Sequence, residues 1–296
     1  MLDEEWADDR IRFKLIKSLI DSTRRFGKVE NVKIIVALRQ DLLNKVLYST
    51  RQSGFQEEKY KSLYLYLKWN KDQLKELLEK RLNVLVKRSY TKTKITLDEI
   101  MPLKIDGVSS LDYLLDRTFF RPRDIIIFLN ECISCAEGCS KLTASIIKKA
   151  EDQYSYERLQ SLATEWLLFY PNLFAVVQIF NGLTDHFKVS SLTRDYFEEK
   201  YTEIAVNLTD IENDPIAQKI DTLFTSSGNF ESVRSYILRE FYMVGLLGLK
   251  ISPTSSISWN YQSTMSLSPG QIKPNAIVYI HPMFHRSLGI KMRKQN

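Results

Sequence analysis

Apolar residues recur at helical spacing along most of this chain. Residues 3–26 show the pattern first, with apolar side chains three or four positions apart, acidic residues in the first turns and Arg24 and Arg25 in the last. The same spacing, bounded by residues that favour helix ends, predicts further helices. They cover residues 70–86, 109–119, 122–138, 143–170, 171–181, 191–206, 214–226 and 230–244. The chain is therefore predicted to be mostly α.

Two short segments near the start have the pattern of strands rather than helices. Residues 32–38, VKIIVAL, are mostly apolar and β-branched, which is typical of a strand buried on both faces of a parallel sheet. Residues 61–69, KSLYLYLKW, are the second candidate. Helices around these strands predict a partial α/β unit over residues 1–90. Two strands do not make a whole doubly wound sheet, so the unit either belongs to a longer fold or completes its sheet with a partner.

The C-terminal part predicts a winged helix. Helices at 214–226 and 230–244 precede two strand-like segments, 246–252 and 275–282, which flank a polar Ser-, Pro- and Gly-rich segment at 252–274. Helices followed by a long β-hairpin have the order of a winged helix. The expected domains are the α/β unit at 1–90, a helical domain at 91–190 and the winged helix at 191–296.

Composition and charge narrow the classes of partner. No apolar run approaches the roughly 20 residues of a membrane span, and the acidic start, MLDEEWADDR, lacks the features of a signal peptide. We therefore expect a cytoplasmic protein with no membrane partner. The net charge is +6, and no Asp or Glu follows Glu240, although six Lys or Arg residues do. Basic surfaces favour nucleic acid, so DNA is a possible partner, although six charges over that length form a weak patch.

The helix before the predicted hairpin is the candidate for reading DNA. Its apolar positions, which we expect to be buried, are Phe230, Val233, Ile237 and Phe241. Glu231, Ser235 and Arg239 would then be exposed. A DNA-reading helix usually shows more Arg, Lys, Asn or Gln toward the groove. Docking within the protein or in an oligomer is the favoured role, with DNA reading as the alternative.

The cysteines and histidines do not form a metal motif. Cys132, Cys135 and Cys139 are spaced to lie along one face of one predicted helix, but no further Cys or His pair lies nearby. That helix is otherwise apolar, which favours buried free thiols. His281 and His285 are four residues apart, but no carboxylate completes an H-E-x-x-H pattern. No metal site is therefore predicted.

An Arg-Pro-Arg step opens the helix at 122–138. Pro122 suits the first turn of a helix because its φ is already helical and it has no N–H to leave unpaired. Arg121 before the helix and Arg123 in its first turn oppose the helix dipole, and Asp124 partly offsets this. The pair is a packing coincidence, an ion-pair anchor or a hook for an anion, and the pattern alone leaves all three open.

Seven segments, in order, resemble the C-terminal two-thirds of bacterial P-loop ATPases of the AAA+/STAND type. They are LDEEW, VKIIVALRQDLL, LKWNKDQLKELLEKRL, DRTFFRPRDIIIFLN, AEDQYSYERL, EFYMVGLLG and VYIHPMF. The resemblance implies that a nucleotide lies between an α/β core and a helical lid, here residues 91–190. It places Arg123 at the sensor 2 position and Pro122 at the nucleotide-contacting proline of the STAND lid, with Arg121 as the runner-up for the phosphate contact.

The resemblance also suggests roles near the start of the chain. Arg39, at the end of the predicted strand, matches the sensor 1 position, and the alternative is an ordinary ion pair with Asp41. Asp3 and Glu4 resemble the end of a Walker B segment, whose carboxylates would order Mg²⁺ and the attacking water. The alternative is that they are simply acidic residues in the first turn of a helix.

No complete catalytic centre is recognisable in the sequence. It contains no G-x-x-x-x-G-K-[ST], no G-x-G-x-x-G and no G-x-S-x-G. We expect ATP or ADP and Mg²⁺ in an intact parent protein, but neither ATP binding nor hydrolysis by this chain alone. The expected partner is an N-terminal P-loop segment or a separate chain that carries it, and a homo-oligomer is possible. The expected function is regulatory, in antiphage defence by analogy, and the alternative is a winged-helix module that binds DNA or protein.

Overall fold

The computed structural model of this chain describes residues 9–27, 29–39, 42–43, 46, 61–87, 94–225, 228–262 and 267–293. Within it the chain forms two compact units, Met1–Lys68 and Trp69–Asn296. Helix α3 (Lys71–Lys87), which the sequence analysis grouped with the N-terminal α/β unit, belongs to the second of them. The division into three domains at residues 90 and 190 stays a prediction.

The first unit contains one long described helix, α1 (Asp9–Phe26), and the short 3-10 helix η3 (Lys61–Leu63). The helix is where the spacing predicted it, but its buried face is not the expected one: Ile11, Leu15 and Phe26, which recur at helical spacing in the sequence, are exposed. The described core of this unit consists of Phe13, Ile16 and Ile20 of α1 with Leu42 and Val46.

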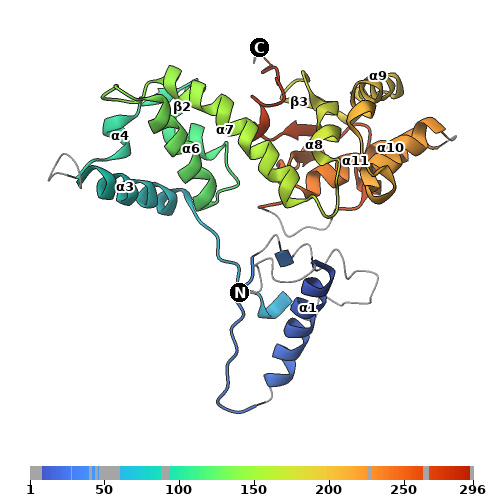
Figure 1. Ribbon diagram of the computed structural model, residues 1–296, viewed down its shortest axis with the longest axis horizontal. Helices are drawn as coiled ribbons and strands as arrows, with labels where there is room; N and C mark the ends of the chain where they lie inside the picture. Colours follow the sequence, from blue (N-terminus) through green and yellow to red (C-terminus); the bar gives the residue numbers. More distant parts are fainter. Residues whose placement is uncertain are drawn as a thin grey trace. The chain divides into compact units, whose positions relative to one another are not determined.

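The two predicted strands of this unit are wrong. Neither 29–39 nor 61–69 contains a strand (Figure 1), and their large apolar side chains face solvent. Ile35 is 83% exposed, Leu65 86% and Leu67 88%. A strand forms where a neighbouring strand pairs its N–H and C=O groups, and neither segment belongs to either sheet of the described residues. Both segments have the composition of buried strands, but composition alone does not make a strand.

The second unit begins with a group of helices that Figure 1 shows in teal to yellow-green, with the long helix α7 leading from it to the rest of the unit. The serine cap that the sequence favours at the start of the helix at 109–119 is confirmed, since the Ser109 hydroxyl accepts from the Asp112 N–H at 3.1 Å. Thr143 caps α7 in the same way, and its hydroxyl accepts from the Ile146 N–H at 3.2 Å. The group consists of α3, α4 (Leu97–Ile100), β1 (Lys104–Ile105), β2 (Val108–Ser109), α5 (Ser110–Leu115), α6 (Pro122–Cys135) and α7 (Ala144–Glu165).

The remainder of the second unit has the topology of a winged helix. An antiparallel sheet has the order β3-β6-β4-β5, and helices α10 and α11 precede the β4–β6 hairpin, as predicted. The helices and strands are α8 (Leu173–Val176), β3 (His186–Lys188), α9 (Arg194–Ile204), α10 (Pro215–Thr225), α11 (Phe230–Met243), β4 (Leu247–Lys250), β5 (Ser258–Trp259) and β6 (Ile277–Ile280). The short 3-10 helices are η4 (Val177–Phe180), η5 (Val189–Ser191), η6 (Ala205–Asn207), η7 (Ile211–Asn213), η8 (Pro269–Gln271) and η9 (Pro282–Phe284).

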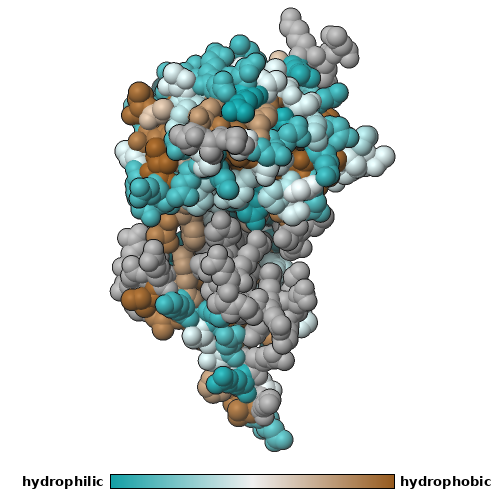
Figure 2. Space-filling view, turned by 90° about the vertical axis from the view of Figure 1, so that its right-hand side faces the viewer, coloured by the Kyte–Doolittle hydropathy of each residue, from teal (hydrophilic) through white to brown (hydrophobic). Residues whose placement is uncertain are grey.

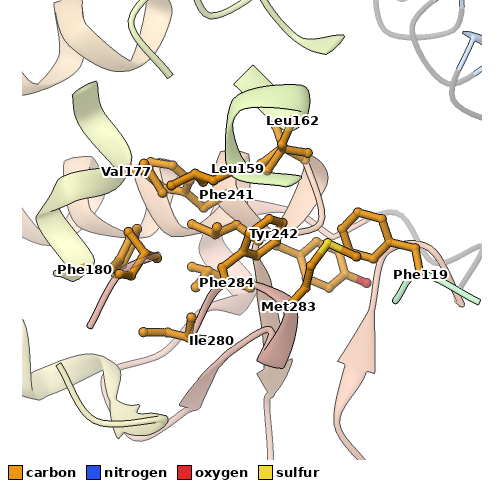
Figure 3. Close-up of a cluster of buried hydrophobic side chains, with 14 of the residues drawn as sticks. Phe119, Leu159, Leu162, Val177, Phe180, Phe241, Tyr242, Ile280, Met283 and Phe284 are labelled. Atoms are coloured by element: carbon orange, nitrogen blue, oxygen red, sulfur yellow. The ribbon is translucent and has the colours of Figure 1, made fainter. Parts of the chain in front are cut away.

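Helix α7 joins the two groups through a shared apolar core (Figure 3). Leu159 and Leu162 of α7 lie in the same cluster as Phe241 of α11 and Phe284 of η9. A polar contact adds to it, because the Ser287 N–H donates to Ser155 Oγ at 3.0 Å. Full burial of one aromatic or branched apolar side chain stabilises the folded protein by about 1.5–3 kcal/mol. The winged helix is therefore packed onto α7 rather than tethered to it.

The described part of the protein is mostly α with small antiparallel sheets, which confirms the predicted fold class apart from the N-terminal strands. On the face drawn in Figure 2, hydrophilic residues cover much of the described surface and hydrophobic residues form separate patches. None of the described helices has the length and hydropathy needed to cross a membrane.

Candidate functional site

The loop before α6 holds an unusual backbone conformation. Phe120 has φ of +53°, which costs a non-glycine residue about 1 kcal/mol or more. Two hydrogen bonds hold the turn: the Phe120 N–H donates to Thr118 Oγ1 at 3.1 Å, and the Phe119 N–H to Asp124 Oδ2 at 3.2 Å. The loop therefore delivers the chain to α6 in a fixed direction.

The Arg-Pro-Arg step lies at the helix start, as predicted. Arg121 is the N-cap residue with φ of −102°, and Pro122 is the first residue of α6. Arg121 approaches Glu165, with Nη1 to Oε2 at 3.9 Å, and its guanidinium lies 5.3 Å from the centre of the Phe119 ring. Arg123 is exposed and makes no ion pair or hydrogen bond to any residue the structure describes. Arg121 is thus partly anchored, and Arg123 presents a guanidinium to solvent.

Buried charges fix α6 against α7. Asp124, in the first turn of α6, is 1% exposed and lies 3.5 Å from Nη2 of Arg158, which is 6% exposed. An ion pair taken out of water needs its full set of hydrogen bonds to offset the loss of hydration. Asp124 obtains a second bond from the Phe119 N–H. The acid that offsets the helix-start arginines is therefore also a packing anchor.

A second buried carboxylate, Glu151, lies on α7 about two helical turns before Arg158. Glu151 accepts from the Tyr113 hydroxyl and from Nε of Arg117 at 2.7 Å. Nε of Arg286, beyond η9, lies 3.7 Å from the same carboxylate. Burial raises the pKa of the Tyr113 hydroxyl, and its hydrogen bond to Glu151 acts in the same direction. This cluster joins α5, α7 and the winged helix, and it was not among the sites predicted from the sequence.

Helical spacing could have revealed these buried charges. The buried positions of α7 recur three or four residues apart, and the polar ones fall on the same stripe as the apolar ones. They are Ile147, Ala150, Glu151, Tyr154, Ser155, Arg158, Leu159 and Leu162. A charged residue on such a stripe indicates a buried pair, because an unpaired one would be too costly.

The other nucleotide-site candidates belong to other parts of the chain. Arg39 is an exposed residue of the first compact unit, whereas Arg121, Pro122 and Arg123 belong to the second. Asp3 and Glu4 lie outside the described residues. A joint site formed by these residues stays a prediction.

The candidate DNA-reading helix is covered along most of its length. Arg239 was expected to be exposed, but it is 7% exposed, with Nη1 donating to the Glu240 carboxylate and Nε to the Leu267 carbonyl. Ser235 donates to the Ile272 carbonyl at 3.2 Å. The segment around η8 therefore packs on the face of α11 that would enter a DNA groove. The expectation for Glu231 is confirmed, since it is exposed.

The cysteines and the paired histidines have structural roles. Cys139 lies beyond the end of α6, so the three cysteines do not share one helix as predicted. Burial raises the pKa of Cys132 to about 12, which keeps its thiol protonated. His281 accepts from the Met283 N–H at 3.1 Å, and burial lowers its pKa to about 3. Among the described residues, no His, Cys, Asp and Glu side chains gather as metal ligands would.

The start of α6 presents an exposed cation rather than a set of backbone donors. Pro122 has no N–H, and the N–H groups of Asp124 and Ile125 both donate to the Arg121 carbonyl, at 3.1 and 3.3 Å. The Arg123 guanidinium is exposed there, while the neighbouring carboxylate of Asp124 is buried and engaged.

Comparison with known proteins gives two findings. The FunZ-associated C-terminal helical domain matches residues 72–163, which include α3 to α7 and the Arg-Pro-Arg step. A "Putative transposon gamma-delta 80.3 kDa protein" of Escherichia coli (strain K12) is 23% identical over 293 residues. That alignment covers 98% of this chain but 39% of the relative, so the chain spans about two fifths of the relative's length. No solved structure matches. The part of the second unit from α3 to α7 is thus similar to the FunZ-associated C-terminal helical domain.

Proposed function

We propose that this chain is the C-terminal, nucleotide-responsive region of a P-loop ATPase, regulatory in role and unable to hydrolyse ATP alone. The observation that carries the proposal is the exposed guanidinium of Arg123 in the first turn of α6, without a described ion-pair partner. A phosphate there would relieve the unfavourable encounter of this cation with the helix dipole. A guanidinium also makes bidentate contacts to phosphate oxygens.

The surroundings of α6 support a switch that reaches the winged helix. The Phe119 ring, two residues before Arg121, lies 4.9 Å from the rings of Tyr261 and His281. Gly245, with φ of +91°, follows α11, and a Cβ there would approach the Phe119 ring to 3.1 Å. A shift of the loop before α6 would therefore move side chains of the winged helix directly.

The exposed apolar segments of the first unit support the need for a partner. Residues 32–38 and 61–69 have strand composition, but no strand pairs with them among the described residues. We propose that a P-loop segment, in the same protein or in a partner chain, supplies the neighbouring strands, the phosphate cradle and the Mg²⁺ site. Asp3, Glu4 and Arg39 would act only in that assembly. Homo-oligomer formation, a cytoplasmic location and a role in antiphage defence are further parts of the proposal.

Titration calorimetry tests the proposal. The 296-residue chain should show no measurable ATP binding, whereas a longer protein that contains a P-loop segment should bind ATP with Mg²⁺. In the longer protein, Arg123→Ala should weaken binding about tenfold or more, since a charged hydrogen bond contributes about 1.5–3 kcal/mol. Arg121→Ala should have a smaller effect, and Lys141→Ala, at an exposed position, none. Micromolar binding by the short chain, or equal effects of the two arginine variants, would contradict the proposal.

The alternative is a winged-helix module that binds DNA or protein. Of these two partners, the structure of α11 favours protein. The cover over α11 leaves Glu231 and Ser232 as the exposed polar residues of this helix, and neither is a cation. A duplex-reading helix needs base-contacting side chains in the groove. DNA binding by the winged helix would therefore have to use another surface.

A further inference from the structure

The outer face of the winged-helix sheet carries aromatic and basic side chains. Residues alternate between the two faces along a strand, and the inward ones, such as Phe187, Val278 and Leu249, are buried. The outward ones come from all of the strands in the order β3-β6-β4-β5. They are His186, Lys188, Ile277, Tyr279, Gly248, Lys250 and Trp259.

Aromatic rings form one row across this face. His186 pairs with Tyr279, Tyr279 with Gly248, and Gly248 with Trp259 in the strand register. The His186 and Tyr279 rings stack at a centroid distance of 5.4 Å and an angle of 15°. Gly248 has no side chain, and the Trp259 ring lies over it, 2.8 Å from where a Cβ would be. Three half-buried rings thus share a platform that spans the sheet.

A second row on the same face carries positive charge. Lys188 and Lys250 both pair in register with Ile277, so the two amines flank one apolar side chain. Neither lysine forms an ion pair with a described residue. Lys273 lies in the turn before β6, next to η5, because the Ser190 N–H donates to the carbonyl of Pro274.

The side of the aromatic row opposite these lysines is also basic near His186. Lys291 forms a bridge with Thr184, and the Arg293 N–H donates to Asp185 Oδ1 at 3.1 Å. Asp185 is the one acid that contacts the row among described residues, with Oδ2 at 3.2 Å from Nδ1 of His186. From residue 241 onward the sequence has no Asp or Glu. Basic residues therefore lie along both sides of the rings, an arrangement that favours a polyanion.

We propose that the outer face of this sheet binds single-stranded nucleic acid. Bases stack on Tyr279 and its neighbouring rings, and Lys188 and Lys250 contact the phosphates. Stacking on aromatic side chains beside a basic track is how single strands are bound without base reading. A duplex keeps its bases inside the helix, so the rings distinguish single strands from duplexes. The surface lies away from α11, and the proposal does not depend on nucleotide binding at Arg123.

Fluorescence anisotropy with the full 296-residue chain tests this proposal. The probes are labelled oligothymidylate and oligouridylate of about 15 nucleotides, in about 50 mM salt, and a duplex of equal length. The single strands should bind more tightly than the duplex, and their affinity should fall as salt rises. The double variant Lys188→Glu/Lys250→Glu should weaken binding at least about tenfold. Tyr279→Ala should weaken it at least about fivefold, since stacking contributes about 1–3 kcal/mol per base.

Matched controls come from the helical group. Lys141→Glu is an exposed charge reversal, and Tyr156→Ala removes a ring that is 46% exposed on α7. Both should bind the single strands as the unchanged protein does. Tyr279→Leu keeps an apolar side chain if Tyr279→Ala does not fold, and it should weaken binding in the same direction.

Three results would overturn the proposal. The first is no single-strand binding in low salt. The second is equal loss in Lys141→Glu and in the Lys188→Glu/Lys250→Glu variant, which would mean that only the net charge matters. The third is preferred duplex binding that Tyr279→Ala leaves unchanged. A face that binds another protein instead would give the first result.

Discussion

Asp124 and Arg158 form a buried ion pair that links the first turn of α6 to the middle of α7. Asp124 Oδ1 lies 3.5 Å from Arg158 Nη2, and its other oxygen accepts from the Phe119 N–H at 3.2 Å. One carboxylate therefore holds both a helix-to-helix contact and the loop that positions Arg121. The pair explains why an acidic residue follows an arginine step at a helix start.

Removing one partner of this pair should be strongly destabilising. Asp124→Ala leaves the Arg158 charge buried without a partner, which costs about 3–5 kcal/mol in the free energy of unfolding. The double variant Asp124→Ala/Arg158→Met should be less destabilised than the sum of the single variants by about 1 kcal/mol or more, measured by urea denaturation. Asp98→Ala is the control, since Asp98 pairs with Lys75 but is 72% exposed, and it should change stability by less than about 1 kcal/mol. Additive single effects would show that the pair is not coupled.

Arg239 should matter for stability rather than for DNA. Its guanidinium pairs with Glu240, which is fully buried and also accepts from the Tyr170 hydroxyl. Arg239→Ala should cost about 3 kcal/mol or more, because it leaves the Glu240 charge unpaired in the core. Arg81→Ala, at an exposed position of α3, should stay within about 0.5 kcal/mol. If Arg239→Ala weakened DNA binding without changing the unfolding midpoint, the cover over α11 would open in solution.

Acid should destabilise the winged helix through His281. Burial lowers the pKa of His281 to about 3, and the charges of His285 and Arg117 act in the same direction. The unfolded chain has a histidine pKa of about 6.5, so between these values it binds a proton that the folded state does not. The contribution of His281 to the free energy of unfolding should therefore be complete above about pH 6.5. It should decrease as the pH falls toward 3, by up to about 1.4 kcal/mol per pH unit.

Urea denaturation at several pH values measures this slope. His281→Gln should show a shallower decrease than the unchanged protein, whatever its absolute stability. His285 adds to the same trend, because burial lowers its pKa as well. An unchanged slope in His281→Gln would mean that His281 is not the group that takes up the proton.

The helices were predictable because each carries its own signal. Periodic apolar residues and caps such as Ser109 and Thr143 lie within the segments that they organise. The hairpin of β4 and β6 was predictable for the same reason, since its strands are close in sequence. Strand β3, by contrast, pairs with β6 across some ninety residues, His186 with Tyr279, and a three-residue strand has too little pattern to predict.

The candidate site shows the same limit. The position of Pro122 at the helix start followed from its fixed φ, and the structure confirms it. The partner of Arg121 could not be predicted in the same way, because Glu165 lies more than forty residues from Arg121 in sequence. The burial of Arg239 was missed because the segment that covers it, near Leu267, follows α11 and has no marker of where it packs.

The exposed apolar segments of the first unit give the last prediction. Ile35, Leu65 and Leu67 are each more than four fifths exposed, and the segments around them have strand composition. Exposed apolar segments of strand composition associate with strands of other molecules. The chain alone should therefore self-associate at tens of micromolar, and the triple variant Ile35→Lys/Leu65→Lys/Leu67→Lys should reduce this, as measured by light scattering. Val206→Lys, which removes an apolar side chain that is 85% exposed in the other unit, is the control and should leave association unchanged. A monomeric unchanged chain would show that these segments find their partners within the chain, and the proposed need for an external sheet would then be wrong.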